Sequence, residues 1–513
     1  MEENSAGGKI YIIGAGMAGT MLAAEITGKG IFGSIAAFLD DDPEKIGREI
    51  RGIPVLGPVD SVLRILRIGP RDEALIAIPG ASPERLRAIY GSLRNSGFGK
   101  IKLLPNLSQI IEGNAHLVQT REIDPQDILG RTPVAINLKE SLAYLRGKRV
   151  LITGAGGSIG GEIARQLLSG GAERLYLFGH GENSIYQIDR ELRLLQEGGV
   201  GEKATIVPVI GDLRDREYMR GIVRDLRCDV VFHAAAYKHV PLMEANPVAA
   251  IDNNVFGTKN LLDACLEADV PRFVLISTDK AVNPVSVYGV SKFLCEKLTL
   301  QAAAAHGTGN GKNGCAYLFV RFGNVLGSRG SILPLFLGQI RKGGPVTVTD
   351  PEMRRYFMTI PEACSLVLKT GGVGENGAAY LLDMGQPVKI IDIAAQLIRF
   401  QGYEPGKEIK IEITGARPGE RLSEPLWSAE EEPVETGFPK IFRLRKNAPD
   451  TAQESGNPDA LLDRLRPVCR FSPEQPELYR NKEALIRCLQ QAVPSYREFC
   501  TQTGGQQKNE SQT

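Results

Sequence analysis

Two pairs of ionisable side chains stand close together in the stretch STDKAVNPVSVYGVSK. Tyr288 and Lys292 are four residues apart, so on a helix they lie on one face. A tyrosine that takes a proton from a hydroxyl group, beside a lysine that lowers its pKa, suits hydride transfer to a nicotinamide. Asp279 and Lys280 precede the tyrosine by only nine and eight positions. Hydride transfer alone needs no second carboxyl and ammonium group, so this pair indicates a further proton-transfer step.

The strand expected before this stretch would bring the four side chains together. The run FVLIS at 273–277 is apolar, as in a buried parallel strand, and leads directly into Thr278 and Asp279. An open α/β sheet binds its ligands at the carboxyl ends of its strands, so we expect a catalytic site there. The pattern can also arise without catalysis. Tyrosine and lysine occur at helical spacing by chance, and the Asp-Lys pair can form a surface turn before the following Asn-Pro.

A glycine-rich loop between a strand and a helix predicts dinucleotide binding. Within RVLITGAGGSIGGEIARQLL it consists of Gly154, Gly157, Ser158, Ile159 and Gly160. Glycines let a pyrophosphate approach the unpaired N–H groups and the positive dipole end at the helix N-terminus. Two later strands are followed by further candidates for cofactor contacts: Asp212, Leu213, Ala234 and Ala235. We expect the Asp212 carboxylate to accept the adenine amino group.

The choice between NAD and NADP stays open. The strand RLYLFG ends in Gly179, where an enzyme that uses NAD usually carries an acidic residue for the ribose hydroxyls. His180 and Asn183 follow, and either can contact a hydroxyl group or a 2′-phosphate. A solvated loop position explains His180 equally well.

A second glycine-rich start lies near the N-terminus. Gly14, Gly16 and Gly19 stand between the strand KIYII and a helix, and the next strand is followed by Asp40. This spacing predicts a small Rossmann-like unit that binds a nucleotide or nucleotide sugar. The same spacing also fits a domain of this shape that binds no dinucleotide.

Composition excludes several classes of protein. The 513 residues include 61 basic and 60 acidic side chains, so no basic surface for nucleic acid is expected. No run approaches the roughly 18 apolar residues of a membrane span, and the first residues lack the pattern of a signal peptide. The eight cysteines show no Cys-x-x-Cys spacing, as is typical of reduced cytosolic thiols. We expect a soluble cytoplasmic protein that binds no metal.

Alternating strands and helices predict an α/β fold with two Rossmann-like, doubly wound parallel sheets. The expected parts are an N-terminal nucleotide-binding domain, a connection with a short helix, an NAD(P)-binding domain, a smaller substrate-binding lobe, and a helical segment with a disordered polar tail. Their expected bounds are 1–114, 115–147, 148–330, 331–445 and 446–513.

Several motifs resemble one family in the same order along the chain. They include TGAGGSIG, AAAYKHVPLMEANP, NNVFGT, STDKAVNP, RFGNVLGSRGSILPLF, MRRYFM and TGARPGERLSEPL. From about residue 9 to 430 the chain resembles the extended short-chain dehydrogenases/reductases, and within them the bacterial UDP-N-acetylglucosamine 4,6-dehydratases of polysaccharide biosynthesis. Many large members have membrane helices ahead of the first Rossmann unit and methionine in place of Tyr288, so this chain is similar to the soluble form.

The resemblance implies a role for each candidate residue. Tyr288 would take the C4 hydroxyl proton, with Lys292 lowering its pKa and binding the nicotinamide ribose, and Thr278 would orient the C4 oxygen. Asp279 would be the acid for the C6 hydroxyl and Lys280 the base at C5. Lys238 and Asn254 would lie near the cofactor, and Lys238 also near the sugar. The implied contacts to the UDP-sugar are Asn324, Arg355, Arg417 and Glu420; Arg417 and Glu420 can instead form a surface salt bridge at a turn.

This chemistry gives the second ionisable pair a purpose. Oxidation at C4 makes the C5 proton acidic, an acid lets the 6-hydroxyl leave, and the hydride returns to C6. A tightly bound NAD or NADP is thus regenerated in each turnover. A C4 epimerase would leave Asp279 and Lys280 idle, and a nucleotide-sensing module would bind the cofactor without turnover. The stereochemistry at C5 stays open, and we expect a homo-oligomer.

Overall fold

The computed structural model describes residues 8–29, 34–98, 100–104, 121–122, 141–201, 203–307, 315–401, 403–447 and 458–500. Most of the expected connection at 115–147, and the polar tail after residue 500, lie outside these residues. The chain forms two compact units. The first contains residues 1–140 with 194–202, and the second contains residues 141–193 with 203–513.

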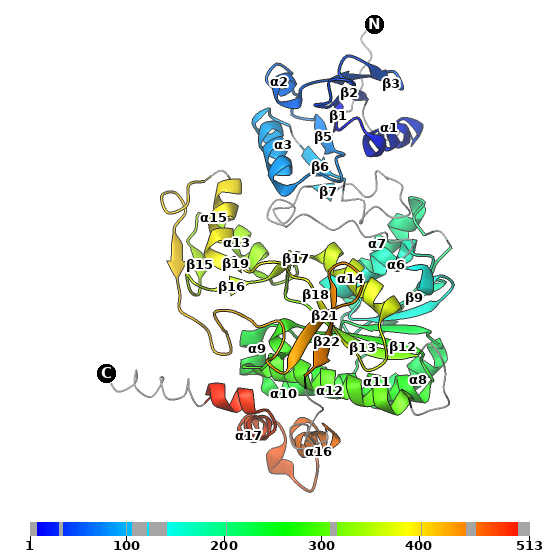
Figure 1. Ribbon diagram of the computed structural model, residues 1–513, viewed down its shortest axis with the longest axis vertical. Helices are drawn as coiled ribbons and strands as arrows, with labels where there is room; N and C mark the ends of the chain where they lie inside the picture. Colours follow the sequence, from blue (N-terminus) through cyan, green and yellow to red (C-terminus); the bar gives the residue numbers. More distant parts are fainter. Residues whose placement is uncertain are drawn as a thin grey trace. The chain divides into compact units, whose positions relative to one another are not determined.

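The first unit is built on a mostly parallel sheet with the strand order β3-β4-β2-β1-β5-β6-β7 (Figure 1). Its central strand β1 has a core on each face: Ile12 packs with Phe38 and Leu75, and Ile13 packs with Leu39 and Ile76. Both faces are therefore covered, as in a doubly wound sheet. The strands are β1 (Ile10–Ile13), β2 (Ile35–Leu39), β3 (Glu49–Ile50), β4 (Ile53–Leu56), β5 (Glu73–Ile76), β6 (Lys100–Leu103) and β7 (Arg121–Glu122). The helices are α1 (Met17–Lys29), α2 (Val59–Leu63) and α3 (Pro83–Asn95).

The second unit contains a nine-stranded sheet with the order β10-β9-β8-β11-β12-β13-β18-β22-β21. The seven strands from β10 to β18 are parallel, and the hairpin β21–β22 adds two antiparallel strands to one end. The chain reverses its direction of winding between β8 and β11, which is where such sheets bind ligands. The strands are β8 (Arg149–Thr153), β9 (Arg174–Gly179), β10 (Thr205–Ile210), β11 (Val230–His233), β12 (Arg272–Ile276), β13 (Ala316–Arg321), β18 (Ala379–Leu382), β21 (Glu431–Glu435) and β22 (Ile441–Lys446).

Helices cover both faces of this sheet (Figure 1). Helices α6 and α14 pack together on one face, whereas α8, α11 and α12 pack on the other around a large core that includes Leu151, Val231 and Phe273. The expected parallel α/β architecture is confirmed. The helices are α6 (Ser158–Ser169), α7 (Glu182–Glu197), α8 (Arg216–Leu226), α9 (Val240–Ala245), α10 (Pro247–Ala250), α11 (Gly257–Glu267), α12 (Val287–Gly307) and α14 (Ile360–Val373), with short helical turns η3 (Ala143–Leu145), η4 (Ile251–Phe256) and η5 (Asp279–Ala281).

Short two-stranded sheets and two helices lie mostly within 331–445, the range predicted for a substrate-binding lobe, and we call them the lobe. Strands β18, β21 and β22 lie in the same range but belong to the nine-stranded sheet. Their bounds are β14 (Asn324–Leu326), α13 (Ile332–Arg341), β15 (Val346–Val348), β16 (Arg354–Arg355), β17 (Phe357–Thr359), β19 (Val388–Lys389), α15 (Ile390–Phe400) and β20 (Ile411–Ile413). The C-terminal elements are α16 (Pro458–Cys469), η6 (Pro476–Leu478) and α17 (Lys482–Ala492), and α16 and α17 pack against α10. In the part of the chain that the structure describes, no helix has the length and apolar character that a bilayer crossing requires.

Candidate active site

The candidate catalytic stretch begins where β12 ends and continues through η5, the candidate catalytic turn, into α12. The Thr278 hydroxyl accepts a hydrogen bond from the Lys280 N–H at 3.4 Å, which caps the short turn. Asn283 adopts the left-handed conformation, with φ of 42°, before the chain enters the helix. A Cβ atom on Gly289 would lie 2.3 Å from the Lys280 carbonyl oxygen. The glycine after Tyr288 therefore lets the helix start pack directly against the catalytic turn.

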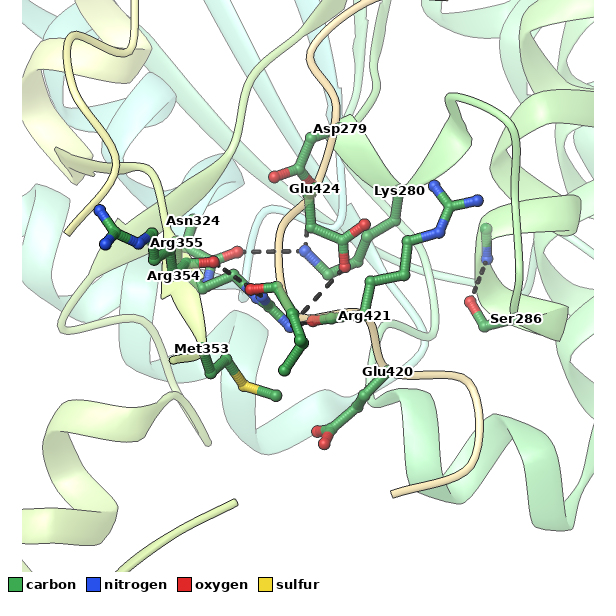
Figure 2. A network of polar contacts seen from close by, with 12 residues as sticks. Asp279, Lys280, Ser286, Asn324, Met353, Arg354, Arg355, Glu420, Arg421 and Glu424 are labelled. Atoms are coloured by element: carbon green, nitrogen blue, oxygen red, sulfur yellow. Dashed lines mark hydrogen bonds and ion pairs between the residues drawn. The ribbon is translucent and has the colours of Figure 1, made fainter. Parts of the chain in front are cut away.

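Asp279 and Lys280 form an ion pair inside this turn (Figure 2). Lys280 Nζ donates to Asp279 Oδ1 at 3.0 Å and to Asn324 Oδ1 at 3.1 Å. The Thr278 hydroxyl donates to the same carboxylate oxygen at 2.9 Å. The Asp279 side chain is fully buried, so the pair is not a solvated surface turn.

The second carboxylate oxygen of Asp279 is left for another partner. Oδ2 is buried and has no hydrogen-bond partner among the residues that the structure describes. A Cβ atom on Gly323 would lie 3.2 Å from it, so the glycine leaves space beside this oxygen. A buried polar atom without a partner is costly, and such atoms mark sites where a ligand or a proton is expected.

Tyr288 and Lys292 lie on α12 and are buried. Burial raises the pKa of Tyr288, and the Asp279 charge adds to this rise, whereas a hydrogen bond with Thr278 lowers it. Burial lowers the pKa of Lys292, against the opposing effect of Cys295 and Glu296. Thr278 thus lowers the pKa of Tyr288. From the sequence, we expected Lys292 to have this effect.

Asn254 lies in a π-helical turn next to this helix. Its amide nitrogen donates to Ser291 Oγ and to the Tyr237 carbonyl oxygen, both at 2.9 Å. Its amide oxygen accepts from the Tyr237 N–H at 2.8 Å. Asn254 therefore fixes α12 against the segment that follows β11. His233 is buried between Thr153 and Thr258, and burial lowers its pKa to about 3, so it is a neutral core residue.

The loop between β8 and α6 has the backbone that a dinucleotide requires. Gly154 has φ of 67°, and a Cβ atom there would lie 2.8 Å from the Ala235 backbone. A Cβ atom on Gly160 would lie 2.3 Å from the Gly154 carbonyl oxygen. Gly157, Ser158 and Ile159 bring the chain into the first turn of α6. Close approach of backbone to ligand is thus possible here, and the residues fit a dinucleotide.

The expected adenosine side of this cleft carries a further ion pair. Arg214 binds both oxygens of Asp212, with contacts between 2.5 and 3.0 Å. The Arg214 hydrogen bond lowers the pKa of Asp212. His180 and Asn183 are exposed after β9, and Leu213 is buried. Asp212 is therefore already engaged with Arg214, a partner that the sequence motif does not indicate.

On the substrate side, Lys238 and Arg355 are held by protein groups. Lys238 Nζ donates to Ser328 Oγ at 3.4 Å, and desolvation and the Lys280 charge lower the pKa of Lys238. Arg355 is buried, and its guanidinium donates to the carbonyl oxygens of Arg421 at 2.8 Å and Leu422 at 3.1 Å. Arg355 thus orders the segment around Arg421.

That segment brings residues to the catalytic turn that the sequence reasoning missed. Arg417 is exposed, and its N–H donates to Glu420 Oε2 at 3.2 Å, so these two form a local turn. Arg421 instead reaches the carbonyl oxygens of Val282 and Asn283. Glu424 is buried next to the ion pair (Figure 2), and burial raises its pKa, with the Lys280 charge opposing and the Asp279 charge adding to the rise. No local pattern distinguishes these two from other charged residues of RPGERLSE.

In the first unit, the glycine-rich loop is tied to Asp40. Asp40 Oδ2 accepts the Ala15 N–H at 2.6 Å, and Lys45 pairs with the same carboxylate. Gly14 has φ of 103°, and a Cβ atom on Gly19 would lie 2.0 Å from the Gly14 carbonyl oxygen. Gly16 has open space around it. In neither unit do the described side chains include three or more His, Cys, Asp or Glu placed to hold a metal ion.

Comparisons with known proteins identify the family of the chain. The pattern of the family described as polysaccharide biosynthesis protein matches residues 150–446. The probable polysaccharide biosynthesis protein EpsC of Bacillus subtilis is 42% identical over 441 residues, which cover 86% of this chain and 72% of that protein. A UDP-N-acetylglucosamine 4,6-dehydratase (inverting) of Campylobacter jejuni is 32% identical over 60% of this chain and 86% of its own length.

Two further similarities bear on fold and chemistry. A UDP-glucose 4-epimerase of Rickettsia bellii is also 32% identical, over 59% of this chain and 84% of its own length. The X-ray structure of Pen from Bacillus thuringiensis superposes with a TM-score of 0.52 at 31% identity, over 59% of this chain and 91% of that one. The chain therefore belongs to the polysaccharide biosynthesis protein family, whose enzymes include nucleotide-sugar dehydratases and epimerases of the extended short-chain dehydrogenase/reductase type.

Proposed function

We propose that the protein is a UDP-N-acetylglucosamine 4,6-dehydratase that uses NAD or NADP and makes a UDP-4-keto-6-deoxy sugar for a surface glycan. The observation that supports it most is the buried ion pair of Asp279 and Lys280 beside Tyr288, with Asp279 Oδ2 unpartnered among the described residues. Such a pair serves water elimination but not hydride transfer alone.

The first step is oxidation at C4, for which the bound nicotinamide supplies the hydride acceptor. Tyr288 accepts the C4 hydroxyl proton, Thr278 holds the C4 oxygen, and Lys292 binds the nicotinamide ribose. An ionised Asp279 raises the pKa of Tyr288, so a protonated Asp279 makes ionisation of the tyrosine easier. The acid form of one residue and the base form of the other therefore favour each other.

The second step is elimination across C5 and C6. Lys280, as the neutral amine, accepts the C5 proton while Asp279 donates the proton on Oδ2 to the leaving 6-hydroxyl, which departs as water. After elimination, Lys280 carries one proton more and Asp279 one fewer. When the hydride returns to C6, Lys280 gives this proton to C5. The proton that Tyr288 took from the C4 hydroxyl group passes to Asp279 through Thr278, whose hydroxyl contacts both residues, so all three side chains return to their starting forms.

The UDP-sugar would be held by groups from both sides of the cleft. Asn324 accepts a hydrogen bond from Lys280, and its side chain can also contact the sugar. Lys238, in the segment after β11, adds a positive charge. Arg355, Arg417 and Glu420 are proposed contacts to the diphosphate and the uridine ribose. We also propose a homo-oligomeric state.

A C4 epimerase is the second candidate, because an epimerase has the same identity to this chain as the dehydratase. An epimerase uses Tyr288 and Lys292 and has no role for a buried acid at Asp279. The two candidates therefore differ in what the loss of that acid does.

The test follows oxidation at C4 and water elimination separately in the variants Asp279→Asn and Lys280→Met. After UDP-N-acetylglucosamine is added, absorbance reports reduced nicotinamide and NMR reports product. We expect formation of the 6-deoxy product to fall by about 10²–10⁴-fold while reduced cofactor accumulates. Asp392→Asn and Lys342→Met, at exposed positions of the substrate lobe, are the matched controls. A C4-inverted product made equally fast by Asp279→Asn and the wild type would establish the epimerase instead.

A further inference from the structure

The loop between β14 and α13 lies on the glycine-rich loop of the cofactor site. The Arg329 N–H donates to Ser158 Oγ at 3.1 Å, and its Nη1 donates to the Gly156 carbonyl oxygen at 2.9 Å. Its Nη2 donates to Gln187 Oε1 on α7 at 3.4 Å. One arginine of the loop thus contacts the start of α6, the loop before it and the next helix.

The other side of this loop is held by the segment that follows β11. Lys238 Nζ donates to Ser328 Oγ at 3.4 Å. Gly330 has φ of 67°, and a Cβ atom there would lie 2.4 Å from the His239 ring. The backbone of the loop therefore passes directly against His239, and only glycine fits at this position.

These two sets of contacts join the segments that follow two neighbouring strands of the sheet. Strands β8 and β11 are adjacent in the sheet, and the segments after them diverge at the point where the strand order reverses. Residues 156–158 follow β8, and residues 238–239 follow β11. The loop 327–331 crosses from one to the other, over the position where an open sheet binds a dinucleotide.

The chemistry at the crossing suits a diphosphate. Arg329 is exposed, and its guanidinium forms paired hydrogen bonds with phosphate oxygens in preference to single ones. Ser158 accepts the Arg329 N–H, so its own hydroxyl hydrogen is free to donate to an anion at the α6 N-terminus.

We propose that the segment Gly327–Ser331 is a strap that holds the dinucleotide in its crevice between turnovers, and that Arg329 contacts the diphosphate. This inference rests on the proposed function, because a reaction that returns its hydride to the substrate needs no exchange of cofactor. The strap is part of the same segment as Asn324, so it connects the sugar side of the site to the cofactor.

The test measures release of NADH and NADPH from Arg329→Ala, Arg329→Lys and wild type by the fluorescence of the reduced nicotinamide, with excess oxidised dinucleotide as a trap. We expect Arg329→Ala to release the dinucleotide about tenfold faster or more, since charge-assisted hydrogen bonds are lost. The release rate of Arg329→Lys should lie between those of Arg329→Ala and the wild type, because lysine keeps the charge but lacks the paired N–H donors of the guanidinium. Arg341→Ala, an exposed arginine on α13, is the control and should release at the wild-type rate.

Thermal unfolding separates a binding role from a structural one. Without dinucleotide, the midpoint of Arg329→Ala should fall only slightly, because the exposed side chain loses two hydrogen bonds, and the increase on adding dinucleotide should shrink much more. Release from Arg329→Ala at the wild-type rate would overturn the strap while leaving the dehydratase in place. A wild type that binds neither dinucleotide would overturn the proposed function and the strap with it.

Discussion

Asp279 and Lys280 share one hydrogen bond, and the position of a single proton decides what both residues can do. With the proton on Asp279, the pair is a neutral acid beside a neutral amine, and with the proton on Lys280 it is an ion pair. The Thr278 hydroxyl and Asn324 orient the two groups. Oδ2 is left for the 6-hydroxyl of the sugar.

The charge of Asp279 also acts on Tyr288, which gives a prediction at the residue scale. Burial first and Asp279 second raise the pKa of Tyr288, so Asp279→Asn should lower that pKa. The oxidation half-reaction needs the ionised tyrosine, so its rate should rise at a lower pH in the variant. Single-turnover formation of reduced nicotinamide across the pH range checks this, with Asp392→Asn as the control. A profile that stays in place would show that Asp279 does not influence Tyr288.

Local patterns indicated that the candidate residues of the turn lie close together, but they did not indicate the distant residues that contact the turn. Tyr288, Lys292 and Asp279 lie within one strand end and one helix start, where spacing alone indicates proximity. Arg329 and Arg421 meet their partners across about 140 to 170 positions of the chain. These contacts form only when the lobe packs on the sheet, so no short sequence motif predicts them.

Among the elements, α12 is tied to the sheet by three charged side chains, of which Arg321 and Glu296 are buried and Glu431 is partly buried. Arg321 on β13 binds Glu296 on α12 at 2.7–2.8 Å and Glu431 on β21 at 2.8–3.0 Å. Glu296 also accepts from Ser277 at 2.6 Å, one residue before the catalytic turn. The helix that carries Tyr288 and Lys292 is thereby fixed at the end of β12.

Removal of Arg321 should be costly because the buried carboxylate of Glu296 and the partly buried carboxylate of Glu431 would lose their partner. We expect Arg321→Met to reduce the free energy of unfolding by about 3–5 kcal/mol. Arg443→Met, which breaks an exposed ion pair on the same hairpin, should cost no more than about 1 kcal/mol. Denaturant unfolding of both variants measures the difference. Equal small losses would mean that the three charged side chains do not hold the helix.

The pH dependence of stability should change in the same variant. Burial alone would raise the pKa of Glu431, but Arg321 and the contacts with Ser428 bring it below the usual value. A lowered pKa gives stability that is complete above the pKa of the unfolded chain, about 4.3, and is lost as the pH falls through the folded value. Arg321→Met should remove this loss, so its stability relative to the wild type improves below about pH 4. Parallel stability curves for the two proteins would contradict this origin of the acid sensitivity.

For the whole molecule, the sequence predicted the two glycine-rich starts and the parallel sheets, because strand and helix periods are local. The antiparallel hairpin β21–β22 at the end of the sheet was not predicted, since its pairing with β18 joins distant residues. The packing of α16 and α17 around Leu485 and Leu489 into the main core was also beyond local pattern.

The two units have separate cores, so equivalent substitutions in the two glycine-rich loops can be compared. Gly19 and Gly160 hold equivalent positions, and a Cβ atom on either would lie within about 2.3 Å of the carbonyl oxygen of the first loop glycine. We expect Gly160→Val to abolish dinucleotide binding and product formation. Gly19→Val should leave both intact and reduce hydrogen-exchange protection only in β1 and α1. Loss of dinucleotide binding in Gly19→Val would contradict the independence of the cores.

A role of the first unit in control is a separate proposal, based on its glycine-rich loop and Asp40. A nucleotide or nucleotide sugar bound there would modulate turnover in the second unit. Gly16 has open space around it, so Gly16→Phe should fill that space without disturbing the core. Unchanged turnover and an unchanged response to added nucleotides in this variant would remove the proposal.

The most direct measurement is NMR of the purified protein with UDP-N-acetylglucosamine in deuterated buffer, first without added cofactor and then with NAD or NADP. Dehydration predicts a new C6 methyl signal and deuterium at C5, and the coupling between H4 and H5 after reduction gives the C5 stereochemistry. A product that keeps its C6 hydroxymethyl group and inverts C4 would contradict dehydration and assign Asp279 and Lys280 a different role.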